Sequence, residues 1–255
     1  MRASTWAWLR RGLFASTERR EVCWSRSRLP RLEELEPRFV LSSWYIAPTG
    51  SDNNPGTINQ PFASLAQASS VAQPGDTVFA RGGLYQPTAT QYLTSSGTAS
   101  APITYEPYPG ETPVIDGSLT PNQAYTHLIS IGGNYMIFEG FTLQNAHGVG
   151  LQSWGGSHLQ ILNNTIHGCQ DNAISLGTNG SLTATTDILV QGNVAYRNAL
   201  NNNGQSWGGG IGTSGASYVR FINNTIYDTM GEGLTLLLCD HVVAQGNVVH
   251  DNFSV

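Results

Sequence analysis

Aromatic and histidine side chains recur at nearly regular spacing in the second half of the chain. His167, Tyr196, Tyr227 and His250 follow one another at intervals of 29, 31 and 23 residues. Rings of these types stack on sugars and hydrogen-bond to their hydroxyl groups, so all four are candidate substrate-binding residues. The alternative is that stacked Tyr and His rings only fill the surface of a repeated fold.

Three of these rings are followed directly by a charged residue. Arg197 comes after Tyr196, Asp228 after Tyr227, and Asp251 after His250. An arginine and two carboxylates beside Tyr and His rings make a surface that can hydrogen-bond sugars, and carboxylates can ligate a cation. The plainer alternative is that Arg197 only neutralises Asp228 on the next repeat.

The spacing reflects a motif that occurs five times, as in Asn163-Asn164-Thr165-Ile166. The second residues of the copies lie 23, 29, 31 and 23 residues apart, and they are Phe141, Asn164, Asn193, Asn224 and Asn247. An apolar residue follows each of the first four, and these are Leu151, Ile174, Ile211 and Leu234. The residues that lengthen the two longer intervals beyond 23 lie around 177–187 and 199–208. A fixed period with insertions at particular corners is typical of a solenoid.

Each repeat contains short alternating runs rich in β-branched and aromatic residues, such as Tyr218-Val219-Arg220-Phe221-Ile222. Such runs predict strands rather than helices. We therefore expect an all-β fold, a right-handed parallel β-helix with about 23 residues per coil and coils stacked ~4.8 Å apart. In this fold Asn164, Asn193, Asn224 and Asn247 form an asparagine ladder, and asparagine also tolerates the left-handed bend of a corner.

The composition agrees with this fold and limits the partners. The chain has 29 Gly and only 11 % charged residues, and all 12 of its basic residues are Arg. Nine of them lie in residues 1–38, so the rest of the chain is acidic. Because phosphate binding needs clustered Lys and Arg, we expect no nucleic-acid partner. A cation or a polysaccharide is compatible with this charge. The three cysteines have no ligand-like spacing.

Residues 1–43 are predicted to be a basic, disordered leader. They contain no apolar stretch long enough for a secretory signal or a membrane span. Within them, Leu35-Glu36-Pro37-Arg38-Phe39-Val40-Leu41 resembles the Leu-Glu-Pro-Arg-x-x-Leu segment near the N-terminus of large exported planctomycete proteins. That resemblance implies an extracellular or cell-surface location.

From Trp44 onward the chain is predicted to be folded, with residues 44–118 as a cap and first coils and residues 119–255 as further coils. Apolar residues at helical spacing between Phe62 and Ala72 predict a short helix. We expect it to cover the open end of the stack, where strand edges would otherwise be exposed.

The block from Trp44 to Tyr85, and its continuation through Pro113-Val114-Ile115-Asp116-Gly117, resembles the opening of right-handed β-helix proteins of the pectate-lyase superfamily. Polysaccharide lyase family nine is among the families it is similar to. The resemblance covers residues 44–255 and is more specific for the fold than for the reaction.

The resemblance implies a calcium ion that bridges acidic side chains to a uronate carboxylate, and a base that removes the C5 proton. The acidic cluster typical of the family aligns with residues 171–175 and 231–235, where Asp171 and Glu232 are the strong ligands. With Asp228 and Asp251 they make up the candidate metal ligands. The base would be Arg197, because the chain has no lysine.

The insertion at 199–208 carries Trp207, a further candidate for sugar stacking. At the other end, the apolar partner of Asn247 would fall beyond Val255, so we expect either a further C-terminal segment or a partner to cover the last coil. The hypotheses are a calcium-dependent uronate lyase that works outside the cell, and a non-catalytic carbohydrate-binding or structural surface module.

Overall fold

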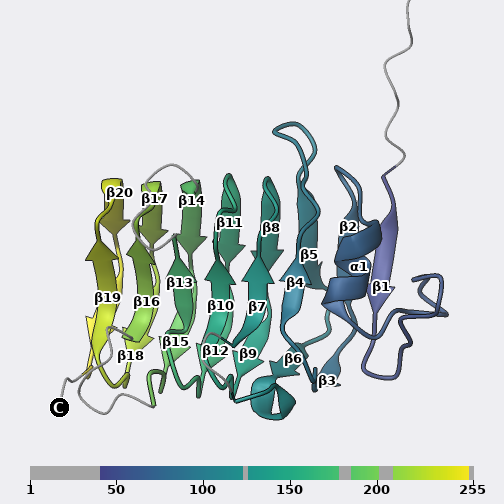
Figure 1. Ribbon diagram of the computed structural model, residues 1–255, viewed down its shortest axis with the longest axis horizontal. Coiled ribbons are helices and arrows are strands. Elements are labelled where there is room, and N and C mark those ends of the chain that lie inside the picture. Colours follow the sequence, from purple (N-terminus) through teal and green to yellow (C-terminus); the bar gives the residue numbers. More distant parts are fainter. Residues whose placement is uncertain (1–40, 123–125, 178–184, 201–208, 253–255) are drawn as a thin grey trace, which may run out of the picture. The chain divides into compact units, whose positions relative to one another are not determined.

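The computed structural model describes residues 41–122, 126–177, 185–200 and 209–252. The predicted leader therefore lies almost wholly outside the described residues, as does Trp207. The described chain winds into coils, and each complete coil contributes one strand to each of three parallel sheets (Figure 1). This confirms the predicted all-β, right-handed parallel β-helix.

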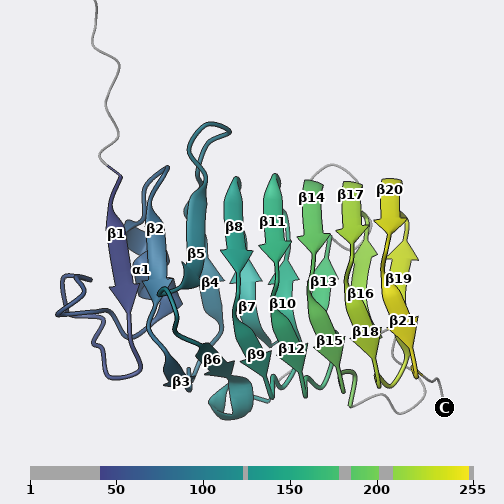
Figure 2. The ribbon, with the colours of Figure 1, turned by 180° about the vertical axis from the view of Figure 1, so that it is seen from behind.

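The strands of each sheet lie side by side along the long axis of the stack, as the view from behind also shows (Figure 2). Sheet 1 consists of β1 (Ser43–Ile46), β2 (Thr77–Ala80), β5 (Ile103–Pro107), β8 (Met136–Glu139), β11 (Leu159–Leu162), β14 (Thr186–Gln191), β17 (Ser217–Ile222) and β20 (Asp240–Gln245). Sheet 2 consists of β3 (Gly83–Tyr85), β6 (Pro113–Asp116), β9 (Thr142–Gln144), β12 (Thr165–His167), β15 (Val194–Tyr196), β18 (Thr225–Tyr227) and β21 (Val248–His250). Sheet 3 consists of β4 (Gln91–Leu93), β7 (His127–Ile131), β10 (Val149–Ser153), β13 (Ile174–Leu176), β16 (Gly209–Ser214) and β19 (Glu232–Leu237).

The core runs through the middle of the coils and consists of stacked apolar columns. In sheet 3 the predicted apolar residues pair in register, Leu151 with Ile174, Ile174 with Ile211, and Ile211 with Leu234. The first three of them are at most 1 % exposed. The two insertions fall between β13 and β14 and between β15 and β16, where they leave this register intact.

The asparagine ladder lies at the corner between sheets 1 and 2 and is confirmed. The side-chain oxygen of Asn193 accepts hydrogen bonds from the backbone N–H (2.9 Å) and Nδ2 (3.1 Å) of Asn164. Asn224 Oδ1 accepts the same two hydrogen bonds from Asn193, and Asn247 Oδ1 accepts them from Asn224. The left-handed bend, however, lies one residue earlier than we expected, at positions such as Asn163 (φ 54°).

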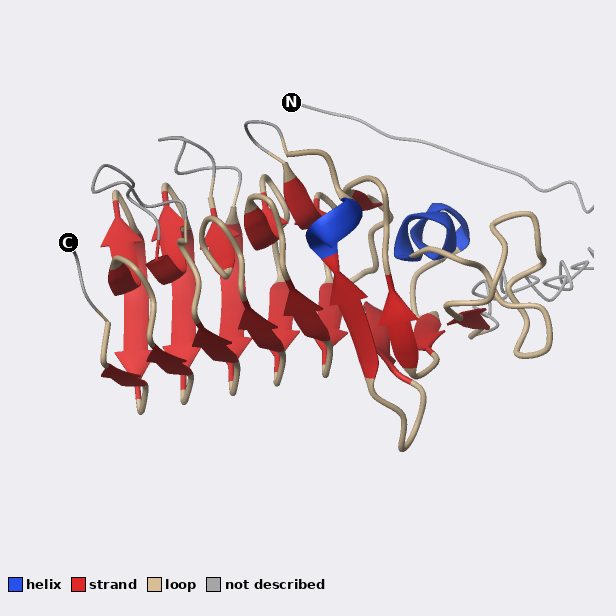
Figure 3. Cartoon of the chain, turned by 90° about the horizontal axis from the view of Figure 1, so that it is seen from below, coloured by secondary structure: helices blue, strands red, loops and turns tan. Residues whose placement is uncertain are grey.

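A 3-10 turn, η1 (Gly117–Leu119), follows β6, and one α-helix, α1 (Leu65–Val71), packs beside β1, β2 and β4 at one end of the stack (Figures 1 and 3). Ser64 caps α1 by accepting a hydrogen bond from the Gln67 N–H (3.1 Å). The predicted capping helix is thus confirmed, though it is shorter than residues 62–72. Among the described residues, no helix is long and apolar enough to span a membrane.

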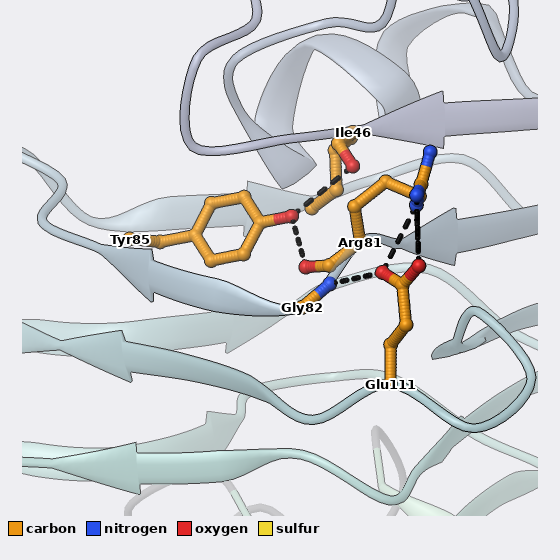
Figure 4. A network of polar contacts seen from close by, with 5 residues as sticks. All are labelled: Ile46, Arg81, Gly82, Tyr85 and Glu111. Atoms are coloured by element: carbon orange, nitrogen blue, oxygen red, sulfur yellow. Dashed lines mark hydrogen bonds and ion pairs between the residues drawn. The ribbon is translucent and has the colours of Figure 1, made fainter.

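Hydrogen bonds of residues 81–85 connect neighbouring coils at this end of the stack (Figure 4). Glu111 accepts hydrogen bonds from Arg81 Nε (2.9 Å) and from the Gly82 N–H, while the Tyr85 hydroxyl donates to the backbone oxygens of Arg81 (2.7 Å) and Ile46 (3.1 Å). The Arg81 guanidinium also lies 4.8 Å from the centre of a tyrosine ring. Arg81 is therefore committed to the fold and is not a candidate for chemistry.

Candidate functional site

The predicted row of rings lies on the outer surface of sheet 2, where its strands end. Strand pairing places His167, Tyr196, Tyr227 and His250 directly beside one another on four successive coils. Their rings are stacked, with centroids 4.7, 5.2 and 5.3 Å apart and planes within 17° of parallel. The predicted column is therefore real, and we call it the ring row.

The stacking changes what the ring row can do. The two faces of Tyr196 and of Tyr227 are covered by neighbouring rings, so neither tyrosine can stack flat on a sugar. What these rings present to solvent is their edges, with hydroxyl and ring-nitrogen groups that can hydrogen-bond. The covered faces argue against flat sugar stacking by these two tyrosines, whose role in substrate binding stays a prediction. A hydrogen-bonding role for the row stays a prediction.

The corner that follows the ring row is made by residues in left-handed backbone conformation, among them Arg197 (φ 52°) and Asp228 (φ 54°). The bend turns both side chains outward on adjacent coils. Arg197 Nε donates to Asp228 Oδ2 at 3.0 Å, and the two side chains are 71 % and 45 % exposed. The predicted proximity of Arg197 and Asp228 is confirmed, and in this geometry they form an ion pair at the surface.

A hollow of about 440 Å³ lies at this corner. Its polar lining comes from Asn145, His167, Tyr196, Arg197 and Asp228. The rest of its wall consists of Gly168, Leu200 and Met230. One cation, one carboxylate, hydrogen-bonding ring edges and apolar side chains thus surround a space open to solvent. We call it the corner hollow.

Asp116 belongs to the same column as the ring row, at its N-terminal end, and was not predicted from the sequence. It is 7 % exposed and accepts hydrogen bonds from Gln144 Nε2 (2.7 Å), Asn145 Nδ2 (3.0 Å) and the Ser118 N–H (2.8 Å). Burial opposes ionisation, but these hydrogen bonds outweigh it and lower the pKa of Asp116. Its carboxylate is thus a fixed negative charge near the corner hollow.

His167 is held in its neutral form. Burial lowers its pKa, the Arg197 cation lowers it further, and the Asp116 carboxylate only partly opposes the shift. A neutral imidazole has one nitrogen that donates and one that accepts. His167 can therefore accept a proton or a hydrogen bond from a group bound in the corner hollow.

The four predicted metal ligands do not come together. Asp228 is paired with Arg197, and Asp251 Oδ2 lies 2.7 Å from His250 Nδ1. Asp171 precedes β13 and Glu232 begins β19, with β16 between them, so they lie ~10 Å apart along the stack. Within the described part of the chain, no three His, Cys, Asp or Glu side chains are placed to hold one ion. A calcium site stays a prediction.

Arg220 and Trp154 also lie at the surface of the described chain. Arg220 points outward from β17, is 53 % exposed and lies 3.6 Å from Asp187, so it is a solvated surface arginine. Trp154, just after β10, is 45 % exposed. Its ring centroid lies 6.2 Å from that of His127.

By its fold and its surface, the protein is a parallel β-helix protein with columns of polar side chains on its outer face. Residues 44–250 match the model of the Pel9A-like right-handed β-helix region. Since this match covers most of the chain, the protein belongs to that family, as the resemblance in the sequence indicated.

Two curated relatives match parts of the chain. Pectate lyase PEL9 of Emericella nidulans is 42 % identical over 87 residues, which are 34 % of this chain and 21 % of that protein. The uncharacterised protein YwoF of Bacillus subtilis is 38 % identical over 139 residues, which are 51 % of this chain and 29 % of that protein. The chain thus spans less than a third of either relative.

Solved structures share the fold at low sequence identity. Pectate lyase Pel9A superposes with a TM-score of 0.62 at 21 % identity, over 81 % of this chain and 55 % of that one. A rhamnogalacturonan lyase superposes with a TM-score of 0.55 at 18 % identity, over 78 % of this chain and 62 % of that one. At these identities the likeness establishes the fold alone.

Proposed function

We propose that this chain is the β-helix region of an extracellular protein that processes uronate-containing polysaccharide. Membership of the Pel9A-like family supports this, and so does the similarity to a protein named as a pectate lyase. Because the chain spans only part of these relatives, the proposal depends on what its own residues can bind.

The observation that carries the proposal is the guanidinium at the corner hollow. Arg197 uses Nε to bond Asp228, and the described contacts of the chain give its Nη groups no further partner. A guanidinium with free donors binds carboxylates in a forked geometry. A uronate carboxylate therefore fits beside Arg197, with the sugar hydroxyls within reach of the Tyr196 and His167 ring edges.

The reaction we propose is β-elimination. A base removes the proton at C5, the electron pair forms the C4–C5 double bond, the C4–O4 bond breaks, and the departing oxygen takes up a proton. Neutralising the neighbouring carboxylate makes C5 more acidic. Arg197, predicted from the sequence as the base, already donates to a carboxylate, so it is better placed to neutralise the substrate. The neutral His167 lines the same hollow and can accept the proton.

The family resemblance also implies calcium, but the described carboxylates do not fit an ion as a group. Asp228 pairs with Arg197, Asp251 Oδ2 lies 2.7 Å from His250 Nδ1, and Asp171 and Glu232 lie two coils apart along the stack. We therefore derive no step through a metal. Whether calcium contributes is decided by the assay below.

The test follows the ultraviolet absorbance of unsaturated uronide product with polygalacturonate, with and without Ca²⁺, alongside retention of the protein on a polygalacturonate affinity gel. We expect product formation that Arg197→Met abolishes and Arg220→Met leaves intact. Product formation that survives Arg197→Met would refute the assigned site. If the protein neither formed product nor was retained on the gel, the proposed substrate would be refuted.

The alternative is a non-catalytic carbohydrate-binding module. The absence of lysine and the loss of most of the acidic cluster favour it. It predicts retention on the affinity gel that depends on Arg197 but no product with any uronate polymer. A purely structural module would show neither.

A further inference from the structure

The place of one strand in sheet 2 is empty at the end of the stack that carries α1. Within residues 41–122, all of which the structure describes, the first coil has β1 in sheet 1, α1 beside β4 of sheet 3, and no strand in sheet 2. Sheet 2 therefore begins with β3, which pairs with β6 on one side only (Figure 2). The other side of β3 is an unpaired sheet edge.

The backbone of Leu84 faces this unpaired edge. The Gly83 N–H donates to the backbone oxygen of Thr112 at 3.2 Å, toward β6. Because the backbone groups of successive strand residues point to opposite sides, the N–H and C=O of Leu84 point away from β6. Unpaired N–H and C=O groups along a sheet edge are a template for pairing with another strand.

A hollow of about 430 Å³ lies beside this edge, and we call it the end hollow. Leu84 and Tyr85 line it, together with Ile46 at the end of β1, Leu65 in α1 and Ile115 in β6. The last three side chains are at most 2 % exposed, so the core supplies an apolar floor. An extended segment points alternate side chains to opposite faces, so one paired with β3 would direct an apolar side chain onto this floor.

The lining of the end hollow favours a polypeptide over a sugar. Of the described residues that line it, one is aromatic, Tyr85, which is only 7 % exposed and offers no open ring face for a sugar to stack on. One is charged, Asp52, whose carboxylate accepts hydrogen bonds from the Ala63 and Ser64 N–H groups, both at 2.9 Å. A basic residue in the bound segment would complement this negative charge.

We propose that a basic, extended segment of another polypeptide binds in the end hollow and adds a strand to β3. Its backbone hydrogen-bonds to the N–H and C=O of Leu84, an apolar side chain enters the hollow, and a Lys or Arg pairs with Asp52. In strand addition the main chain provides affinity and alternate side chains provide specificity. The described linings of the end hollow and the corner hollow share no residue, so this site is independent of the proposed function.

The test measures hydrogen exchange of the Leu84 amide by NMR in the full chain. The probe is a pool of capped heptapeptides with Arg at both ends and Val, Ile, Leu or Thr between them. We expect the pool to protect this amide in a saturable way, and a pool methylated at every backbone nitrogen between the Arg residues to leave it unprotected. Protection by the methylated pool, or by neither pool, would overturn strand addition.

Two other occupants are outcomes of the same experiment. Protection of the Leu84 amide by an oligogalacturonate would assign the end hollow to a sugar. Protection that rises with protein concentration in the absence of peptide would assign it to a second copy of the chain. Either result would overturn the proposed partner.

Leu84→Pro provides the second measurement, made with a fluorescent peptide pool. Proline is tolerated on an edge strand where its nitrogen faces away from the sheet, so the Tm should change by at most about 2 °C. Affinity for the pool should fall about tenfold or more, because a peptide carbonyl loses its donor. Leu84→Ala, the matched control, keeps the N–H and should bind within about threefold of the parent chain.

Asp52→Asn tests the charge. It keeps an oxygen for the Ala63 and Ser64 N–H groups, so we expect it to fold normally and to bind the Arg-containing pool about two- to fivefold more weakly. A pool with Gln in place of Arg should bind both forms equally. Unchanged affinity in Leu84→Pro or in Asp52→Asn would overturn the proposal.

Discussion

The asparagine ladder gives the sharpest prediction about stability. In Asn193→Ala, the Asn164 N–H loses its acceptor, Asn193 Oδ1 (2.9 Å), and the backbone oxygen of Ile161 loses the Asn193 Nδ2 donor (2.9 Å). Asn164 and Asn193 are both fully buried, so water cannot replace these partners without opening the corner. Asn224 is less affected, because its side-chain oxygen still accepts from the backbone of residue 193.

The size of the effect follows from these two losses. Leaving a buried polar group unsatisfied costs about 1–3 kcal/mol, so two such groups give about 2–6 kcal/mol, and some local relaxation brings the expected value to about 3 kcal/mol. For a folded region of this length that corresponds to a fall in Tm of about 6–12 °C.

The assay is urea unfolding followed by circular dichroism, with Tm as a second readout. Gln191→Ala is the matched control, because Gln191 lies two residues away in β14 with its side chain exposed, and its loss should cost no more than about 0.5 kcal/mol. A loss for Asn193→Ala as small as that of the control would refute the view that the ladder holds the coils together.

Three further predictions concern other parts of the structure. Because the pKa of Asp116 is lowered in the folded state, its ionisation stabilises the fold above the unfolded pKa of 3.8, and this stability is lost as the pH falls through the folded pKa. Asp116→Asn should therefore make the loss of stability below pH 3.8 shallower. Urea unfolding at several pH values measures this, and an unchanged slope would contradict it. Gly210→Ala should destabilise the fold by more than about 2 kcal/mol, because an added Cβ would meet the Ile226 side chain, whereas Gly132→Ala meets nothing and should be neutral; equal Tm values would show that the close approach does not matter. Arg197→Met should weaken binding of oligogalacturonate about 10–100-fold with a change of at most about 1 kcal/mol in stability, measured by calorimetry and urea unfolding; a large loss of stability instead would assign the arginine to the fold.

Much of the fold could be predicted because one residue per coil governs the register. Counting from Asn164, Asn193, Asn224 and Asn247 placed the ladder, the ring row and the apolar column of sheet 3 correctly. A second ladder five residues further on was missed, because its members differ in type. There Asn198 Oδ1 accepts a hydrogen bond from the Cys169 N–H at 3.1 Å, and no repeated letter marks the column.

The candidate site was predicted less completely, since column counting gives neighbours but not side-chain directions. It paired Arg197 with Asp228, but it could not show that Tyr196 and Tyr227 cover each other's faces. It also gave no sign that the Trp154 ring lies near that of His127, 6.2 Å away between centroids. Side-chain directions and contacts of this kind are set by three-dimensional packing, which the repeat spacing does not encode.

The nearest-neighbour pattern of the stack has an evolutionary consequence. From Asn164 onward, each coil meets the next through the same three strands and the same corner asparagine, so duplicating one of these coils in the gene leaves every inward side chain facing inward. A duplication of any other length would turn core residues to the surface. Whole-coil duplication can thus lengthen the outer polar columns without redesign of the core, while insertions at the corners vary independently.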